Sequence, residues 1–507
     1  MDIEKRARRQ SRRVVISEIL MFASIIITVL ILVFVVSGYW VSPDFTIERQ
    51  GLLQVYSTPT GADVSIDGSA TSWLQRTNTS KTLSAGEHTV TLTKEGYDSW
   101  SRRINITEGL LYKLHYPRLF LLDRTKESAL ISSANFVTVS PDRNTMLLAN
   151  NTTSWQLFNL DSDSAKPKTL DLAKVLPFAD LTNATSAVNS SSTANPSDAN
   201  SALSVGSFSG NIDSATWSTD NEHVLLKITS DSTTNWLLLS IKNPANSVNL
   251  TEEFNTDFSR IEILDSSASN LLALEDGNLH TIDVHAKQLS GILIKDIVSF
   301  DYYHQEVIFS AAASEDNLKL ITNPPSKEEA NSADGSVSSP YFVGILKLGS
   351  DEITALKYTP EKERTVIYKF YDEEYIATVG EKTATVYQKN DFVEKTSLGL
   401  SFLPEQIKVG SEGDYLAMYT GSNIMTLDME TLSIINWSTD TDSFGWLDGS
   451  MLYAVKDGEL SVYDFDGQNH RTLASGVSSR FPATITSDKY LYYFSDNTLI
   501  REWLVEH

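Results

Sequence analysis

A short unit recurs along the sequence after residue 123, and it constrains the fold more than any other feature. Each copy consists of an apolar, β-type run, a polar turn and a second apolar run. Where no insertion intervenes, the copies are spaced by about 35–45 residues, the period of a repeated four-stranded sheet. The first runs of the eight copies are residues 136–142, 214–220, 261–265, 298–301, 367–372, 406–409, 444–448 and 483–488. The repeat predicts a mainly β fold.

Radial repetition allows many short sheets to bury both faces, so the period predicts a β-propeller of seven or eight blades over residues 124–507. A β-solenoid would have shorter repeats, and a string of immunoglobulin-like domains would need units of about 80–100 residues. Ser140-Pro141-Asp142 and residues 461–469 resemble the repeats of TolB-type, WD-like propellers. We expect the ring to close by pairing residues 499–503 with residues 119–122.

Two segments interrupt the period, near residues 183–207 and 324–340. The first is almost wholly Ser, Asn, Ala, Thr and Gly, without an apolar pattern that could offset the entropy of ordering it. We interpret both as mobile surface loops between blade strands. Their composition favours flexible decoration over functional loops of the propeller rim.

Residues 19–36 contain no charged side chain, and the uncharged stretch continues through Tyr39 and Trp40. About 20 apolar residues span the roughly 30 Å hydrocarbon core of a bilayer, so residues 14–42 predict a single transmembrane anchor. The basic tail, residues 1–13, predicts a cytoplasmic N-terminus with everything after the anchor outside. A cleaved signal peptide is disfavoured, because its apolar region is only about 7–15 residues and small residues precede the cleavage site.

Residues 43–123 predict a small β-sandwich. Residues 88–93 alternate apolar and polar side chains, and Asp67-Gly68 supplies the positive-φ pair of a tight hairpin. The landmarks, in order, are Gly51-Leu52-Leu53, Ser57-Thr58-Pro59-Thr60-Gly61-Ala62, Val64-Ser65-Ile66-Asp67-Gly68, Gly86-Glu87-His88 and Glu95-Gly96-Tyr97. Their order resembles the PEGA domain, with Thr60 in place of the glutamate of the family's name. The resemblance implies an extracytoplasmic spacer or adhesion module. Trp73 and Trp100 are candidates for a carbohydrate-stacking face, although core packing is the simpler interpretation.

Composition and charge exclude several classes of function. The chain has no cysteine, so disulfides, thiolate metal sites and a cysteine nucleophile are ruled out. The formal net charge is −24, although residues 1–13 contain six cations and two anions. Such an acidic body would repel phosphate backbones, so we expect no nucleic-acid partner.

Common catalytic motifs do not occur in the sequence. Residues 206–210 have Phe208 where a serine hydrolase would place its nucleophile, and phosphate-binding loops and His-Glu-x-x-His are lacking. His280 and His285 are five residues apart on an expected strand, hence on opposite faces, which disfavours joint metal binding. We therefore assign no catalytic, cofactor-binding or metal-binding residue and expect no cofactor.

Two acidic pairs remain open as candidates for hydrolysis, because glycosidases need only two carboxylates. These are Asp440 with Asp442 and Asp464 with Asp466, and the second pair could belong to a calcium loop. Turns between strands explain these aspartates more simply. The Asn-x-Ser/Thr sequons at Asn105 and Asn249 need no explanation beyond chance.

These features together predict a non-enzymatic protein of the cell envelope, anchored in the membrane with its ectodomain outside. Its partners would be the lipid bilayer, through the N-terminal helix, and an envelope protein or glycan held by the propeller. The alternative is an extracytoplasmic hydrolase of polysaccharide or peptide that acts at the propeller mouth. A third reading, a sensor that signals inward, is disfavoured because a tail of about 13 residues leaves no room for an effector domain.

Overall fold

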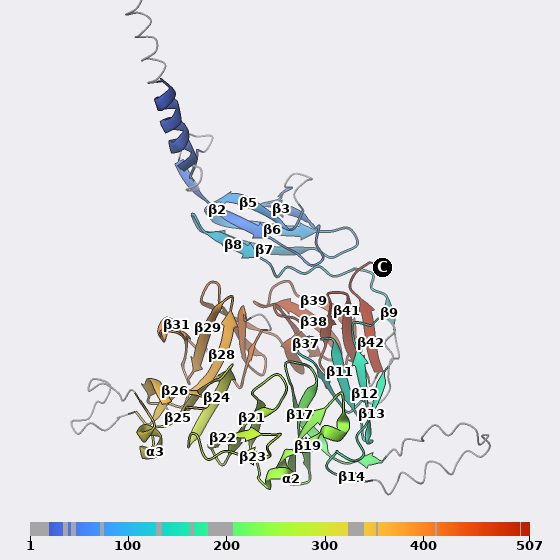
Figure 1. Ribbon diagram of the computed structural model, residues 1–507. Coiled ribbons are helices and arrows are strands. Elements are labelled where there is room, and N and C mark those ends of the chain that lie inside the picture. The colour runs from blue at the N-terminus through green and yellow to red at the C-terminus, as the bar shows by residue number, and fades with distance from the viewer. Residues whose placement is uncertain are drawn as a thin grey trace, which may run out of the picture. The chain divides into compact units, whose positions relative to one another are not determined.

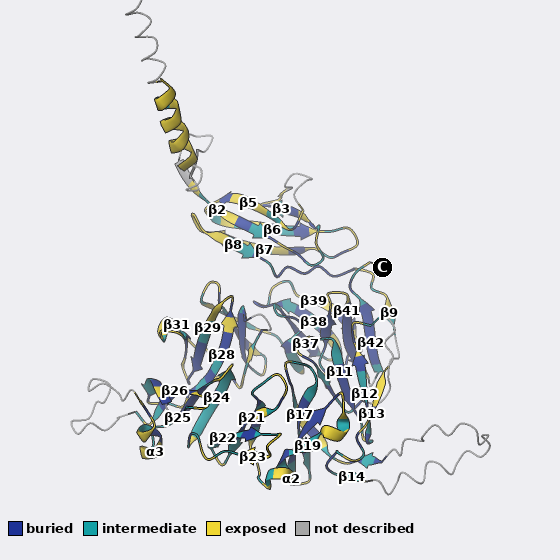
Figure 2. Ribbon diagram, viewed as in Figure 1, coloured by how far each residue is buried: buried dark blue, intermediate teal, exposed yellow. Residues whose placement is uncertain are grey.

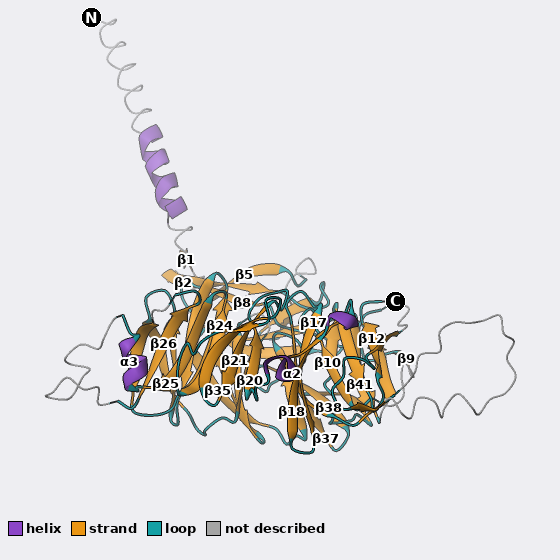
Figure 3. Cartoon of the chain, turned by 60° about the horizontal axis from the view of Figure 1, so that its bottom comes forward, coloured by secondary structure: helices purple, strands orange, loops and turns teal. Residues whose placement is uncertain are grey.

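The computed structural model describes residues 20–33, 39–41, 47–70, 76–127, 134–162, 167–180, 206–322, 339–350, 353–410, 413–496 and 498–506. The chain forms two compact units (Figure 1). The N-terminal unit contains residues 1–124 and 504–507, and the propeller unit contains residues 125–503. Strands dominate both units (Figure 3).

Residues 20–33 form a helix whose large apolar side chains are exposed, among them Leu20, Ile26 and Leu30 (Figure 2). Within the part of the chain that the structure describes, no helix has the length and apolar character needed to cross a bilayer. The predicted anchor also extends to residue 42, and this part of the prediction was wrong, because β1 (Tyr39–Val41) is a strand. Its residues are good strand formers and pair with residues 47–49 of β2 (Ile47–Val55). Residues 1–19, 34–38 and 42 lie outside the described part.

Two small sheets form the rest of the N-terminal unit. In one, β2 pairs with β1 and β5 (Thr79–Ser84) and runs parallel to β8 (Leu111–Leu114). The other has the order β4 (Ser69–Ala70), β3 (Asp63–Ile66), β6 (Gly86–Thr93) and β7 (Trp100–Ile106). Asp67 and Gly68 have φ of 52° and 73°, which confirms the predicted β3–β4 hairpin turn. Trp100 is fully buried and meets Tyr116 edge-on at 5.9 Å, so it belongs to the core.

The described part of the propeller unit contains eight four-stranded antiparallel sheets, each of which is one blade, and a separate two-stranded sheet. The first four are β10 (Phe136–Val139), β11 (Thr145–Ala149), β12 (Ser154–Asn159), β13 (Lys168–Asp171); β16 (Asn211–Trp217), β17 (His223–Ser230), β18 (Thr233–Ser240), β19 (Val248–Asn249); β20 (Arg260–Ile263), β21 (Asn270–Glu275), β22 (Asn278–Asp283), β23 (Gln288–Leu289); and β24 (Ile297–Tyr303), β25 (Glu306–Ala312), β26 (Tyr341–Lys347), β27 (Ile353–Thr359).

The other four blades follow in chain order. They are β28 (Arg364–Phe370), β29 (Glu373–Val379), β30 (Thr383–Gln388), β31 (Val393–Gly399); β32 (Gln406–Val409), β33 (Tyr415–Thr420), β34 (Asn423–Asp428), β35 (Ser433–Ser438); β36 (Ser443–Trp446), β37 (Met451–Lys456), β38 (Glu459–Asp464), β39 (Arg471–Ser475); and β40 (Thr484–Thr486), β41 (Tyr490–Ser495), β42 (Thr498–Trp503), β9 (Lys126–Glu127). The eight repeats of the sequence coincide with the first strands of these blades.

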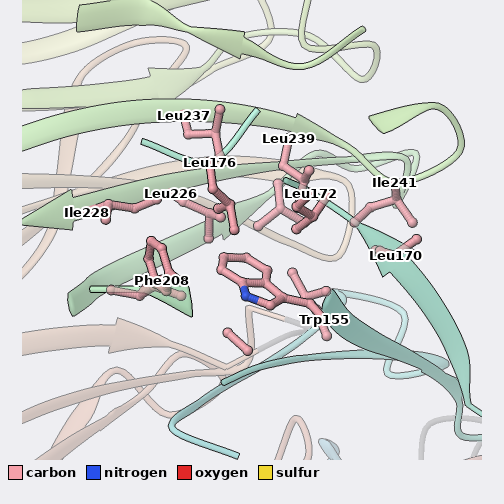
Figure 4. Close-up of a cluster of buried hydrophobic side chains, with 14 of the residues drawn as sticks. Trp155, Leu170, Leu172, Leu176, Phe208, Leu226, Ile228, Leu237, Leu239 and Ile241 are labelled. Carbon is pink, nitrogen blue, oxygen red and sulfur yellow. The ribbon is translucent and has the colours of Figure 1, made fainter. Parts of the chain in front are cut away.

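The first strands of successive blades lie next to one another and form the inner ring. The Trp217 indole of β16 donates to the Thr138 hydroxyl of β10 at 2.9 Å, and the Thr365 amide of β28 donates to the Ser299 hydroxyl of β24 at 3.1 Å. Between blades, the interior is closely packed, as around the fully buried Trp155 (Figure 4). These contacts join the first strands of successive blades.

The ring closes between β42 and β9, which Figure 1 shows side by side. The prediction that residues 119–122 supply the closing strand was wrong. Those residues belong to the N-terminal unit, where the amide of Leu119 donates to the carbonyl of Thr58 at 2.8 Å. Lys126 and Glu127 close the ring because their charges complement Glu502 and Arg501 across the ladder.

The remaining elements lie near the two predicted insertions and between blade strands. They are β14 (Ala179–Asp180), β15 (Ser207–Phe208), the 3₁₀ helix η3 (Pro244–Asn246), α2 (Leu250–Phe254) and α3 (Glu315–Lys319). The first insertion joins β14 to β15, and the second joins α3 to β26. Residues 183–205 and 324–338 themselves lie outside the described part, so the predicted mobility stays a prediction.

Candidate functional site

Two of the polar turns at the ends of the first strands, those after β10 and β16, share a local design. In the turn after β16, the Ser218 hydroxyl donates to Asp220 at 2.6 Å and accepts the amide of His223 at 3.0 Å. Ser140 and Asp142 make the same bond after β10. In these two repeats the Ser-x-Asp pattern thus satisfies its own backbone and brings the inner strand to a defined end.

Three neighbouring strand ends enclose a pocket of about 630 Å³, which we call the inner-ring pocket. This volume falls within the range of roughly 300–1,000 Å³ that is common for ligand sites. The pocket is lined by Trp217, Ser218 and Thr219 after β16, Glu262–Ser266 at the end of β20, and Asp301–His304 at the end of β24. Aromatic and acidic side chains thus meet from three blades.

Asp301 connects two blades at the wall of this pocket. One carboxylate oxygen accepts the amide of Ile367 on β28 at 2.9 Å, and the other accepts the amide of Tyr302 at 2.9 Å. Burial raises the pKa of Asp301 to about 6, although these two amides and nearby Arg260 act in the opposite direction. Glu262 adds to the rise, because a second negative charge disfavours ionisation.

The other two carboxylates of the pocket are held by neighbouring groups. Glu262 pairs with Nε of Arg260 at 2.9 Å. Asp265 accepts hydrogen bonds from the amides of Ser269 and Asn270 at 2.8 and 3.0 Å. Burial alone would raise the pKa of Asp265, but its hydrogen bonds outweigh burial and the net pKa is lowered. Asp265 therefore stays ionised at neutral pH, and Glu262 is held in place by Arg260.

The Tyr302 side chain reports the electrostatic character of the pocket. Burial raises its pKa well above the usual range, and Glu262, Asp301 and Asp265 raise it further, against Arg260. Three carboxylates on two blades thus act on one phenol. The lining of the inner-ring pocket combines three carboxylates with the aromatic residues Trp217, Tyr302 and Tyr303.

A second pocket of about 530 Å³ lies between the fourth and fifth blades. Lys389 in its wall approaches Glu306 and Glu374 at 2.5 Å each, and Glu374 also lies 3.7 Å from Nδ1 of His304. Burial lowers the pKa of Lys389, but the two carboxylates outweigh burial and the net shift is upward. The charged residues of this lining balance, with Glu306 and Asp391 against Lys347 and Lys389, whereas the inner-ring pocket keeps an excess of carboxylates and is the better candidate for a charged ligand.

The acidic pairs from the sequence occupy other places. Asp440 and Asp442 both face Lys456, at 3.6 and 3.1 Å. Asp464 and Asp466 are buried in the turn after β38, where Asn469 donates to Asp464 at 2.8 Å and the Gln468 amide donates to Asp466 at 3.1 Å. Neither pair lines the inner-ring pocket.

The remaining candidates also have structural surroundings. His280 is buried and its Nδ1 lies 3.0 Å from the Ser290 carbonyl, whereas His285 is exposed in the turn after β22 and not on the strand as predicted. Asn105 is exposed on β7, and Asn249 caps α2. Trp73 lies outside the described residues. Among those described, no three His, Asp or Glu side chains are arranged to hold a metal ion.

Sequence reasoning missed Glu262, Asp301 and Tyr302 as members of one site. Glu262 and Asp301 lie in the first runs of the third and fourth repeats, each a charged residue beside apolar ones. This departure from the strand pattern was the available signal. It does not reveal that the two side chains converge, because they are separated by a whole blade.

Comparison with known proteins bears on the two units separately. Residues 50–118 match the family described as PEGA domain. The N-terminal unit thus carries a PEGA domain, as its landmarks indicated. The match ends before the propeller unit, and no curated protein matches the sequence.

Solved structures similar to the chain include β-propellers. The Dos1 propeller has a TM-score of 0.42 and 10% identity, covering 76% of this chain and 95% of its own. The Cps50 (Swd1) β-propeller domain of Myceliophteria thermophila has a TM-score of 0.40 and 10% identity, covering 76% and 100%. Oligogalacturonate lyase of Vibrio parahaemolyticus has a TM-score of 0.36 and 11% identity, covering 57% and 88%. The propeller assignment rests on the sheet topology and not on these similarities.

Proposed function

We propose that this protein is a membrane-anchored, extracytoplasmic binding protein whose propeller holds an envelope protein or glycan in the inner-ring pocket. The observation that carries the proposal is the convergence of three inner-strand ends on one pocket with aromatic walls. Propellers bind ligands at such converging turns, because a rigid ring of sheets holds the turns in position. The PEGA domain would serve as an extracytoplasmic spacer.

The anchor part of the proposal rests on residues 20–33. This helix is apolar on every side, and its exposed side chains include Phe22, Ile25 and Val29. An all-round apolar helix needs an apolar surrounding, and the uncharged stretch continues after it through Pro43. The Thr28 hydroxyl donates to the Ser24 carbonyl at 2.8 Å, which satisfies its polar group within the helix.

The lack of cysteine makes the topology directly testable. Ser11→Cys would place a thiol in the tail, and Ser479→Cys would place one on an exposed turn of the propeller unit. In intact cells, a membrane-impermeant maleimide should label Cys at 479 only, and permeabilisation should expose the other. Labelling of both, or of the tail alone, would contradict the proposed orientation.

The binding part is tested with the full chain in detergent on an array of envelope proteins, glycans and cell-wall fragments. Tyr303→Ala removes an aromatic wall of the pocket, and Tyr56→Ala removes a tyrosine of the N-terminal unit that is 37% exposed. Binding that is lost with the first variant and kept with the second supports the proposal. A ligand that binds both variants equally would place recognition elsewhere.

A hydrolase acting at the propeller mouth is the alternative, and Asp301 is the observation that favours it. A carboxyl group with a pKa of about 6 suits a general acid near neutral pH. Against it, both oxygens of Asp301 accept backbone amides. Mass spectrometry of the array would decide: cleavage products that disappear in Asp301→Asn would establish the enzyme.

A further inference from the structure

The charge of the inner-ring pocket narrows the class of its ligand. Its lining includes Glu262, Asp265 and Asp301, whereas Arg260 is the cation that acts on Tyr302 and Asp301. Arg260 is already engaged: it pairs with Glu262, donates to the Phe300 carbonyl at 3.1 Å and lies 4.2 Å from the centroid of that ring. The pocket therefore keeps an excess of negative charge.

The position of Tyr302 shows that the three carboxylates act on a common region. Burial is the main cause of the raised pKa of this phenol, and all three carboxylates add to it, so their negative charges act together on this wall of the pocket. Trp217 and Tyr303 add aromatic surface to the lining. A planar cation gains from both features, because guanidinium groups bind carboxylates and stack on aromatic rings.

We propose that the inner-ring pocket receives an arginine side chain from a basic segment of a protein partner. This inference rests on the proposed binding function and chooses the protein over the glycan. A neutral sugar gains little from three carboxylates, and an anionic polysaccharide would be repelled by them. The net charge of −24 draws a basic partner toward the protein at a distance, and the pocket then selects the planar cation.

The test measures fluorescence anisotropy of a fluorescein-labelled Gly-Arg-Gly-Arg-Gly peptide with the full chain in detergent. The matched peptide has citrulline in place of arginine, which keeps the shape and removes the charge. We expect the citrulline peptide to bind at least about tenfold more weakly. Equal binding of the two peptides would overturn the inference.

Two double variants separate the pocket from the general acidity of the surface. Glu262→Gln with Asp301→Asn removes two carboxylates of the pocket, and Asp440→Asn with Asp442→Asn removes two that face Lys456. The first should weaken arginine-peptide binding about tenfold or more, and the second by less than about twofold. If both double variants weaken arginine-peptide binding equally, the effect comes from net charge, and the inner-ring pocket is not the binding site.

A pH series on the unmutated chain provides a readout that does not depend on the folding of a variant. Asp301 faces Arg260, Glu262 and the amides of Tyr302 and Ile367, and it gains a proton below about pH 6. Arginine-peptide binding should therefore weaken from about pH 7.5 to about pH 5, while arginine itself stays charged. His304 and Asp265 line the same pocket, so the series is repeated with His304→Gln, which should keep the pH dependence. Binding that is unchanged over this range would contradict the role of Asp301.

Binding of neutral glycans distinguishes failure of this inference from failure of the proposed function. A neutral glycan that binds the full chain and is lost with Tyr303→Ala would overturn the basic partner but leave the binding function standing. If neither peptides nor array ligands depend on pocket residues, both the inference and the proposed function fall.

Discussion

Ring closure depends on a strand of two residues, and we expect Glu127→Ala to open it. In β9, Glu127 lies opposite Arg501, and its carboxylate accepts from Nε of Arg501 at 2.9 Å and from the Trp503 indole at 3.0 Å. Only 3% of the Arg501 side chain is exposed. Beside this pair, Lys126 meets the fully buried Glu502 at 3.1 Å.

The magnitude follows from the burial of the two partners. Removing one member of a buried ion pair costs about 3–5 kcal/mol, because a desolvated charge is left behind. The Glu127 side chain is 38% exposed, so solvent screens part of the interaction. We therefore expect a loss of about 2 kcal/mol in the free energy of opening the β42–β9 ladder.

Amide hydrogen exchange measures this opening locally, since the amide of Trp503 donates to the carbonyl of Thr125 at 3.1 Å. A loss of about 2 kcal/mol corresponds to exchange about 30-fold faster at this amide. Lys319→Ala is the control: it removes exposed contacts with Glu315 and Asp316 and should leave exchange at the Trp503 amide unchanged. Exchange at Trp503 that is no faster in Glu127→Ala than in the control would refute the reasoning.

Three further perturbations follow from the packing and electrostatics of the propeller. Gly413→Ala should cost more than about 2 kcal/mol in urea unfolding, because its Cβ would collide with the Lys369 carbonyl and its φ is +77°. Gly349→Ala, at a φ of +81° with open space around it, should cost about 1 kcal/mol. Equal losses would show that the backbone conformation alone matters. Trp155→Ala should cost about 3–5 kcal/mol in the same assay, as expected for a fully buried indole, and a loss below about 1 kcal/mol would contradict the packing seen in Figure 4. The pKa of Asp301 is raised to about 6, so between about pH 4 and pH 6 the folded state keeps a proton that the unfolded chain has released. The contribution of Asp301 to the free energy of unfolding is therefore complete below about pH 4 and is lost as pH rises to about 6. In Asp301→Asn, the free energy of unfolding should lack this decline of up to about 3 kcal/mol with rising pH. Parallel pH profiles of the variant and the unmutated chain would refute the prediction.

Much of the strand pattern could be predicted because strands and turns are specified locally. The apolar runs and Ser-x-Asp turns of the repeat correspond to the first strands and the turns that follow them, as in β10 and β16. Asp67-Gly68 likewise determines its hairpin through the backbone alone. By contrast, residues 39–41 were assigned to a helix because hydropathy registers apolar character and not the pairing partner that makes β1 a strand.

The sequence by itself determined the number of repeated units, their strands and turns and the PEGA landmarks, since each depends on residues near one another in the chain. The tertiary structure decided the closing strand, because Lys126 and Glu127 have no strand signal until Arg501 and Glu502 lie opposite them. It also decided the inner-ring pocket, whose side chains come from three blades. Residues so far apart in sequence meet only because a ring of sheets places the ends of its first strands side by side.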